Sequence, residues 1–183
     1  MAEGRGSRTV LVVSLVVGIV LVGFVAVLAV SAGGDDDTAA SALIGEAAPP
    51  VVGTSLDGEP FDIDDHRGKW VLVNYFATWC PPCVEEHPEL IAFDEAHADA
   101  GDVELVSVVF DDNEENVRTF FENNGGDWPV LVEGTDGVAV SWGVLTVPET
   151  FLVSPQGIVV HRFTGGVTQE DLESVLAEAR GTV

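Results

Sequence analysis

The two cysteines of the chain lie close together in the segment FATWCPPCVEEHPEL, residues 76–90. Two prolines separate Cys80 from Cys83, and Trp79 precedes the first cysteine. Two thiols at this spacing support three kinds of chemistry: reversible disulfide exchange, one half of a metal site, or a structural cross-link. The residues on either side of the pair help to decide among them.

The position of the pair in the chain favours redox chemistry. The apolar stretch 70–77 precedes it, and residues 81–98, which have a helical composition, follow it. Pro81 suits the first position of a helix, because that position needs no N–H donor. Cys80 is then expected to cap the helix, where unpaired amides and the positive end of the helix dipole stabilise a thiolate. We therefore expect Cys80 to be the nucleophile and Cys83 the resolving thiol.

Two other interpretations of the cysteine pair stay open. A zinc site needs four ligands, and the candidates to complete one are the histidines: His66, His87, His97 and His161. The prolines between the cysteines and the strand-to-helix junction favour redox chemistry over this metal site. A purely structural disulfide is less favoured, because a cross-link that closes so short a loop removes little entropy from the unfolded chain. We expect no bound metal and no cofactor other than the disulfide itself.

Glu86 is a further candidate, since it lies three residues after Cys83 and so on the same face of the helix. A carboxylate there can accept and return the proton of the resolving thiol, while its charge opposes thiolate formation. The alternative is a solvated helix residue like its neighbour Glu85. Spacing alone leaves both interpretations open.

Pro148, in the segment LTVPETF, begins the apolar run that leads into the last part of the sheet. A proline at this position is either a plain strand start or a cis-proline in a tight turn. Because cis peptide bonds are rare, the residues by themselves predict the plain strand start.

The remaining patterns predict a sheet flanked by helices. Residues 70–77 and 103–110 are near-continuously apolar, which is typical of central strands, and the helix between them makes the two strands parallel. Residues 115–126 predict a second helix and residues 128–133 a short strand. Residues 149–163 predict a β-hairpin around Ser-Pro-Gln-Gly.

A closing helix is predicted near the C-terminus. Thr168 and Asp171 resemble a capping box at its start. Its apolar face consists of Leu172, Val175, Leu176 and Ala179. The order of all these elements predicts an α/β fold with a mixed sheet.

The N-terminal part of the chain predicts a membrane anchor. Residues 10–30 contain no charge and are long enough to span a bilayer. Arg5 and Arg8 precede this run and three aspartates, 35–37, follow it, which places the rest of the chain outside the cytoplasm. A cleaved secretory signal is the alternative, although its apolar region is usually shorter. The predicted organisation is a cytoplasmic N-terminus (1–9), a transmembrane anchor (10–30), a flexible linker (31–48) and a folded domain (49–183).

The charge of the chain excludes one class of partner. The net charge is −24, and the first 34 residues contribute +1, which leaves −25 for the remainder. Such a surface repels phosphates, so we expect no nucleic-acid binding. The acidic residues are scattered along the sequence, which indicates a generally solvated or salt-adapted surface rather than one acidic binding face.

Two segments together resemble a known family. VLVNYFATWCPPCVEEHPEL (71–90) and GVLTVPETFLVSPQGIVVHRFTGG (143–166) are similar to the membrane-tethered, thioredoxin-like thiol:disulfide oxidoreductases of the TlpA/ResA/CcmG (DsbE) type. The resemblance covers roughly residues 49–180. It implies a thioredoxin fold with an N-terminal extension and a central insertion at about residues 113–143.

The resemblance also implies roles for individual residues. Pro148 would be cis and packed opposite the cysteines, with Val147 offering backbone groups to an extended substrate. Glu86 would tune the site and handle protons, Glu149 would join it in disfavouring the thiolate, and Asn74 would replace a buried aspartate of cytoplasmic thioredoxins. The surroundings of the exposed sulfur would be shaped by Trp79, Pro81 and Pro82.

The implied function is the reduction of protein disulfides outside the cytoplasm, such as the C-x-x-C-H pair of apocytochrome c. The electron donor would be a membrane thiol relay of the CcdA or DsbD kind. Three alternatives remain: an oxidant that inserts disulfides, a peroxiredoxin-like peroxidase, which residues 45–80 also resemble, and a copper-binding thiol module. The W-C-P-P-C pair argues against the peroxidase, and the single methionine of the chain argues against the copper module.

Overall fold

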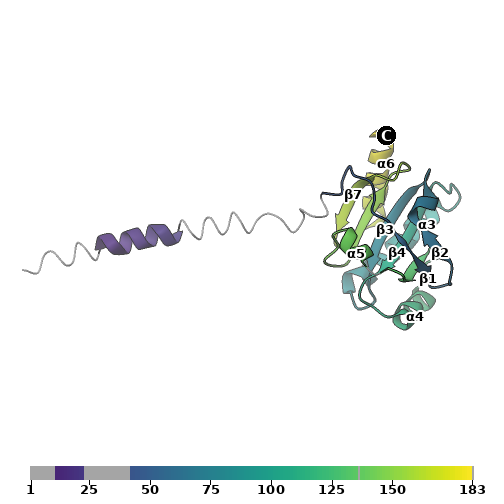
Figure 1. The fold of residues 1–183 in the computed structure, drawn as a ribbon, viewed down its shortest axis with the longest axis horizontal. Helices are drawn as coiled ribbons and strands as arrows, with labels where there is room; N and C mark the ends of the chain where they lie inside the picture. The colour runs from purple at the N-terminus through teal and green to yellow at the C-terminus, as the bar shows by residue number, and fades with distance from the viewer. Residues whose placement is uncertain (1–10, 23–41, 136, 183) are drawn as a thin grey trace, which may run out of the picture. The chain divides into compact units, whose positions relative to one another are not determined.

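The strand that precedes the cysteines, β3 (Trp70–Phe76), lies near the middle of a seven-stranded sheet, and all seven of its residues are buried. It pairs in parallel with β4 (Val103–Val109) and antiparallel with β6 (Glu149–Val153). The order across the sheet is β2-β1-β5-β4-β3-β6-β7 (Figure 1). The other strands are β1 (Val52–Ser55), β2 (Pro60–Asp62), β5 (Val130–Glu133) and β7 (Val159–Thr164).

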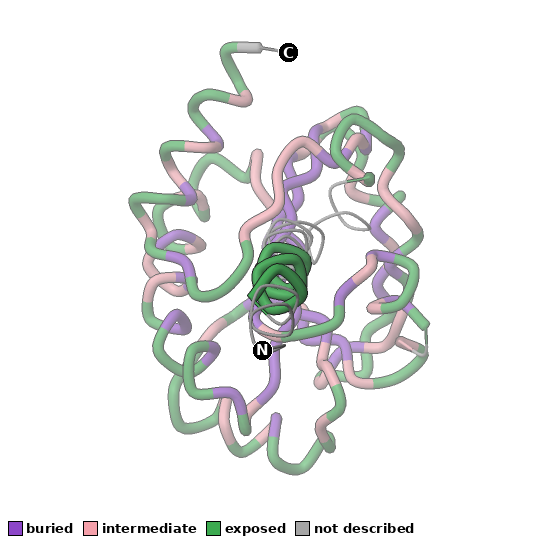
Figure 2. The backbone as a smooth tube through the Cα atoms, turned by 90° about the vertical axis from the view of Figure 1, so that its left-hand side faces the viewer, coloured by how far each residue is buried: buried purple, intermediate pink, exposed green. Residues whose placement is uncertain are grey.

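The computed structural model describes residues 11–22, 42–135 and 137–182. The chain divides into two compact units, 1–38 and 39–183. In the first unit, residues 11–22 form a helix that is exposed along its length (Figure 2). None of the helices in the described part of the chain has the length and apolarity needed to cross a bilayer. Much of the predicted anchor and most of the predicted linker lie outside the described residues.

Helices cover both faces of the sheet. On one face, apolar side chains of β3 pack with α3 (Pro81–His97), α4 (Glu114–Asn124) and α6 (Gln169–Thr182). Figure 2 shows buried and exposed residues alternating along α6, which ends at the C-terminus. The opposite face is covered by the 3₁₀ helix η1 (Ile63–His66) and the short helix α5 (Val138–Ser141).

The α/β prediction is confirmed, including the parallel central pair and the hairpin of β6 and β7. The hairpin turn closes with the N–H of Gly157 donating to the carbonyl oxygen of Ser154 at 2.7 Å. Gly157 has φ +77°, a backbone conformation that glycine adopts without a steric penalty. The capping box is confirmed as well, because Thr168 and Asp171 exchange hydrogen bonds at the start of α6.

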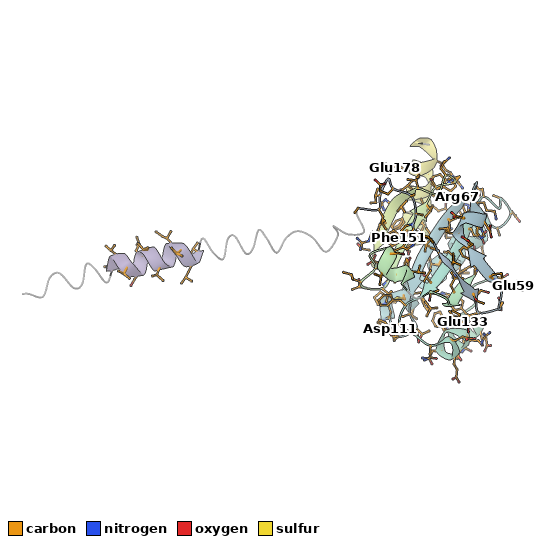
Figure 3. All side chains as sticks on the ribbon, viewed as in Figure 1. Glu59, Arg67, Asp111, Glu133, Phe151 and Glu178 are labelled. Carbon is orange, nitrogen blue, oxygen red and sulfur yellow. A yellow bond between two sulfur atoms is a disulfide. The ribbon has the colours of Figure 1, made fainter. Side chains whose placement is uncertain are left out.

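The sequence patterns missed the strands β1 and β2 and the helix α5. The residues that resemble a central insertion, 113–143, contain α4, β5 and α5, and β5 is an integral strand next to β4. The acidic residues labelled in Figure 3, Glu59, Asp111, Glu133 and Glu178, lie on different sides of the domain. The prediction of a scattered acidic surface fits this placement.

Candidate active site

The two cysteines form a disulfide at the junction between β3 and α3, with 5.3 Å between their Cα atoms. Pro81 is the first residue of α3 and Cys80 is its N-cap, as the sequence predicts. The backbone N–H of Cys83 donates to Sγ of Cys80 at 3.3 Å. The sulfur of Cys80 therefore lies at the positive end of the helix dipole, where negative charge is stabilised.

The two sulfurs differ in their access to solvent. Cys80 retains 3% of its surface exposed, whereas Cys83 has none. Trp79, Pro81 and Pro82 are exposed around the pair, and the indole N–H of Trp79 donates to the carbonyl oxygen of Asp111 at 2.9 Å. A partner thiol or disulfide can thus reach Cys80 more readily than Cys83.

A cis peptide bond faces the disulfide. The bond between Val147 and Pro148 is cis, so the prediction of a plain strand start, made from the residues alone, is wrong and the resemblance gives the correct geometry. The carbonyl oxygen of Val147 lies 3.4 Å from Sγ of Cys80. This oxygen can only accept hydrogen bonds, so in the reduced protein it favours the thiol of Cys80 over the thiolate.

Glu86 is buried, with 2% of its surface exposed, whereas its neighbour Glu85 is exposed. Its Oε1 accepts a hydrogen bond from Nδ2 of Asn74 at 2.9 Å, and its Oε2 accepts one from the backbone N–H of Val167 at 3.1 Å. Burial raises the pKa of Glu86 to about 7, although both hydrogen bonds lower it. The interpretation of Glu86 as a solvated helix residue is wrong. A group with this pKa can exchange protons near neutral pH.

A set of polar side chains extends from Glu86 into the sheet. Asn74 also donates to Oγ1 of Thr150 at 3.0 Å, and Oγ of Ser107 donates to Oδ1 of Asn74 at 3.4 Å. The indole N–H of Trp128 donates to Oγ of Ser107 at 2.9 Å. Sequence reasoning missed Thr150, Ser107 and Trp128. A usable signal existed, since β3 and β4 each place one polar residue in a buried stretch and β6 places two, and Asn74 is in register with both Ser107 and Thr150.

The structure does not bring Glu149 to the cysteine pair. Glu149 is opposite Tyr75 in the sheet, so both side chains lie on the face that α5 covers, away from α3. The carboxylate of Glu149 forms a buried ion pair with Arg162 at 3.0 Å. The expectation that Glu149 disfavours the thiolate therefore finds no direct contact to support it.

The histidines do not gather around the sulfurs. Nε2 of His87 lies 2.9 Å from the carbonyl oxygen of Gly125, which requires this nitrogen to carry the proton. Burial lowers the pKa of His87. Across residues 11–22, 42–135 and 137–182, no group of three or more His, Cys, Asp and Glu side chains is arranged to hold a metal ion.

Comparisons with known proteins identify the family and the fold of the chain. A family model described as Redoxin matches residues 43–178. A thiol-disulfide oxidoreductase, ResA, from Geobacillus thermodenitrificans is 34% identical over 133 residues, which are 73% of this chain and 76% of the relative. Two crystal structures have a similar fold. One is a thiol:disulfide interchange protein from Chlorobium tepidum, with 26% identity and a TM-score of 0.65 over 73% of this chain and 94% of the other.

The second structure is the thioredoxin domain of a thiol-disulfide oxidoreductase from Bacteroides vulgatus, with 27% identity and a TM-score of 0.66 over 74% of this chain and 96% of the other. The fold is therefore thioredoxin-like, and the pair at its expected position is the redox-active disulfide of a thiol:disulfide oxidoreductase. With its family match and its cysteine pair at the start of α3, the chain belongs to the redoxin family and, within it, to the thioredoxin-like thiol:disulfide oxidoreductases of the ResA type.

Proposed function

We propose that this oxidoreductase acts outside the cytoplasm as a reductant of protein disulfides, with the C-x-x-C-H pair of apocytochrome c as its substrate. Residues 10–30 would anchor it in the membrane, and a membrane thiol relay of the CcdA or DsbD kind would return electrons to it. The disulfide is the redox group, and the reaction requires no further cofactor.

The reaction begins with the reduced protein. The thiolate of Cys80 attacks one sulfur of the substrate disulfide, and the other substrate sulfur leaves as a thiolate that takes up a proton. Cys83 then transfers its proton to Glu86 and attacks Sγ of Cys80. The bond between Cys80 and the substrate breaks, and the departing sulfur takes the proton from Glu86. Two electrons have then passed from the cysteine pair to the substrate, and the protein holds its disulfide.

The contact between the Val147 carbonyl oxygen and Sγ of Cys80, at 3.4 Å, carries the proposal that the direction is reduction. Strong oxidants of this chemistry owe their power to a stabilised thiolate in the reduced form. A carbonyl oxygen beside Cys80 stabilises the thiol instead, and a buried acid at Glu86 opposes negative charge on Cys83 in the same way. The helix N-terminus acts in the opposite direction and keeps Cys80 reactive enough to attack.

The test uses a synthetic disulfide peptide that contains a Cys-x-x-Cys-His sequence. Mixed with the reduced full chain, this peptide is expected to be reduced with one equivalent of protein consumed per disulfide. Cys83→Ser should accumulate a mixed disulfide with the peptide, and Cys80→Ser should not react. An oxidised chain that instead oxidises the reduced peptide almost completely would make disulfide insertion the function.

The location outside the cytoplasm has its own test. In spheroplasts of a host that expresses the full chain, an added protease is expected to degrade the residues after the predicted anchor while a cytoplasmic marker stays intact. Protection of the whole chain until the membrane is broken would contradict the proposed orientation.

A further inference from the structure

Four polar side chains form a continuous line of hydrogen bonds through the apolar interior. The line runs from α3 across β3 and β4 to the residues that precede β5. The line joins Trp128, Ser107, Asn74 and Glu86, with donor–acceptor distances of 2.9 Å, 3.4 Å and 2.9 Å in that order. The exposed fractions of these four residues are 7%, 1%, 0% and 2%. Among the described residues, none of the atoms in this line is a buried polar atom without a partner.

The donor and acceptor roles along this line are fixed. The indole N–H of Trp128 can only donate, so Oγ of Ser107 accepts from it. The hydroxyl proton of Ser107 is then free to point at Oδ1 of Asn74. Because Oδ1 is held by this proton, the NH₂ group of Asn74 is directed at Oε1 of Glu86 and at Oγ1 of Thr150.

We propose that Trp128 and Ser107 are positioning residues of the redox site: they act through Asn74 and keep an N–H, rather than a C=O, facing the carboxyl group of Glu86. The importance of this role rests on the proposed function, in which Glu86 carries the proton of Cys83. The arrangement of the hydrogen bonds itself does not depend on that function.

An asparagine needs such a constraint, because its amide can turn over with little change in shape and exchange its oxygen for its nitrogen. In the inverted orientation Oδ1 would face Glu86, and only a protonated carboxyl group could bond to it. Thr150 cannot prevent this inversion, since a hydroxyl group both accepts and donates. Ser107 can prevent it only while its proton is directed at Asn74, and the donor from Trp128 provides that condition.

The remaining groups around Glu86 are few. The backbone N–H of Val167, ahead of α6, donates to Oε2, and Cys83 lies one turn earlier on the same helix. A Cβ atom added at Gly166 would lie 3.9 Å from Oε2, so the chain ahead of α6 closes this side. Burial is the largest cause of the raised pKa of Glu86, and the hydrogen bonds from Asn74 and Val167 act against it. Loss of the Asn74 donor should therefore be visible in the titration of Glu86.

The experiment follows the side-chain carboxyl carbon of Glu86 by NMR in the oxidised, ¹³C-glutamate-labelled full chain, with the signal assigned from Glu86→Gln. Ser107→Ala is expected to raise the titration midpoint by about one pH unit, which is a tenfold change in the proton affinity of the carboxylate. Trp128→Phe removes the N–H donor together with part of the aromatic ring system, and it should raise the titration midpoint of Glu86 in the same direction. In an Asn74→Leu background, Ser107→Ala should produce no further shift.

Ser154→Ala is the matched control, because Ser154 is 3% exposed and hydrogen-bonded but lies in the hairpin turn, outside the line. Its titration midpoint for Glu86 should equal that of the unmodified chain. Unchanged midpoints in both Ser107→Ala and Trp128→Phe would overturn the proposal, as would an equal shift from Ser107→Ala in the Asn74→Leu background. If Ser107→Ala does not fold, Trp128→Phe decides alone. The titration uses no substrate, so a failure of the proposed function leaves its result intact.

Discussion

Replacing Glu86 by Gln should change how the stability of the protein depends on pH. The folded protein keeps the Glu86 proton up to about pH 7, whereas the unfolded chain releases it near the ordinary value of 4.5. Between these two values the unfolded state binds fewer protons than the folded state, so stability falls as the pH rises. Below pH 4.5 the contribution of Glu86 to the stability of the folded protein is complete, and above about pH 7 it is lost. Glu86→Gln has no proton to release and lacks this dependence.

The size of the effect follows from the shift. A rise of the Glu86 pKa from 4.5 to about 7, at about 1.4 kcal/mol per pKa unit, corresponds to roughly 3 kcal/mol. The free energy of unfolding of the unmodified chain should therefore fall by about that amount, relative to Glu86→Gln, between pH 4.5 and pH 7.5. The other groups that titrate in this range, such as His87, are present in both proteins and cancel in the difference.

Urea unfolding of the oxidised protein at closely spaced pH values, followed by the fluorescence of the buried tryptophans, measures this difference. Glu85→Gln, one residue earlier and exposed, is the matched control and should keep the pH dependence of the unmodified chain. The reasoning is refuted if the stability curves of the unmodified chain and of Glu86→Gln run parallel over the whole range.

Three further changes test other parts of the structure. Glu86→Gln should slow the attack of Cys83 on a mixed disulfide by about 100-fold or more in stopped-flow measurements, with Glu85→Gln unaffected; equal rates would remove Glu86 from proton transfer. Arg162→Met should lower the free energy of urea unfolding by about 3–5 kcal/mol, because it leaves the Glu149 carboxylate buried without its 3.0 Å partner, and adding Glu149→Gln should recover part of the loss; no recovery would show that the pair is not the cause. Asn113→Ala removes a cap that accepts a 2.9 Å hydrogen bond from the first turn of α4 and should cost about 1 kcal/mol by thermal unfolding; an unchanged midpoint temperature would argue against that cap.

The sequence predicts those helices and strands whose own residues carry a strong pattern, such as a long apolar run or a capping residue. β3 is buried at every residue and α3 starts at a proline, so apolar runs and capping rules locate both. β1 and β2 were missed because they are short strands with only one buried residue each: β2 lies at the edge of the sheet, and β1 depends on pairing with β5, which is distant in sequence. The four-residue helix α5 is too short to leave a periodic pattern.

Local sequence rules likewise place some residues of the candidate site and fail to place others. Proline and helix rules place Cys80 at a cap, because the causes lie within a few residues. The burial of Glu86 depends on Asn74 and Val167, which are distant in sequence, so spacing along α3 cannot decide it. Glu149 is next to the cis-proline in sequence, yet strand alternation turns its side chain to the other face of the sheet. Thr150, the following residue, is the one that meets Asn74.

The reduction potential of the Cys80–Cys83 pair tests the central proposal most directly. The full chain is equilibrated with dithiothreitol couples of known composition, and the fraction of disulfide is read at each one. A potential near or below that of thioredoxin, about −270 mV, is the predicted result, because the Val147 carbonyl oxygen and the buried Glu86 both favour thiols over thiolates. A potential near that of strong oxidants, about −120 mV, would contradict it and make disulfide insertion the function of this site.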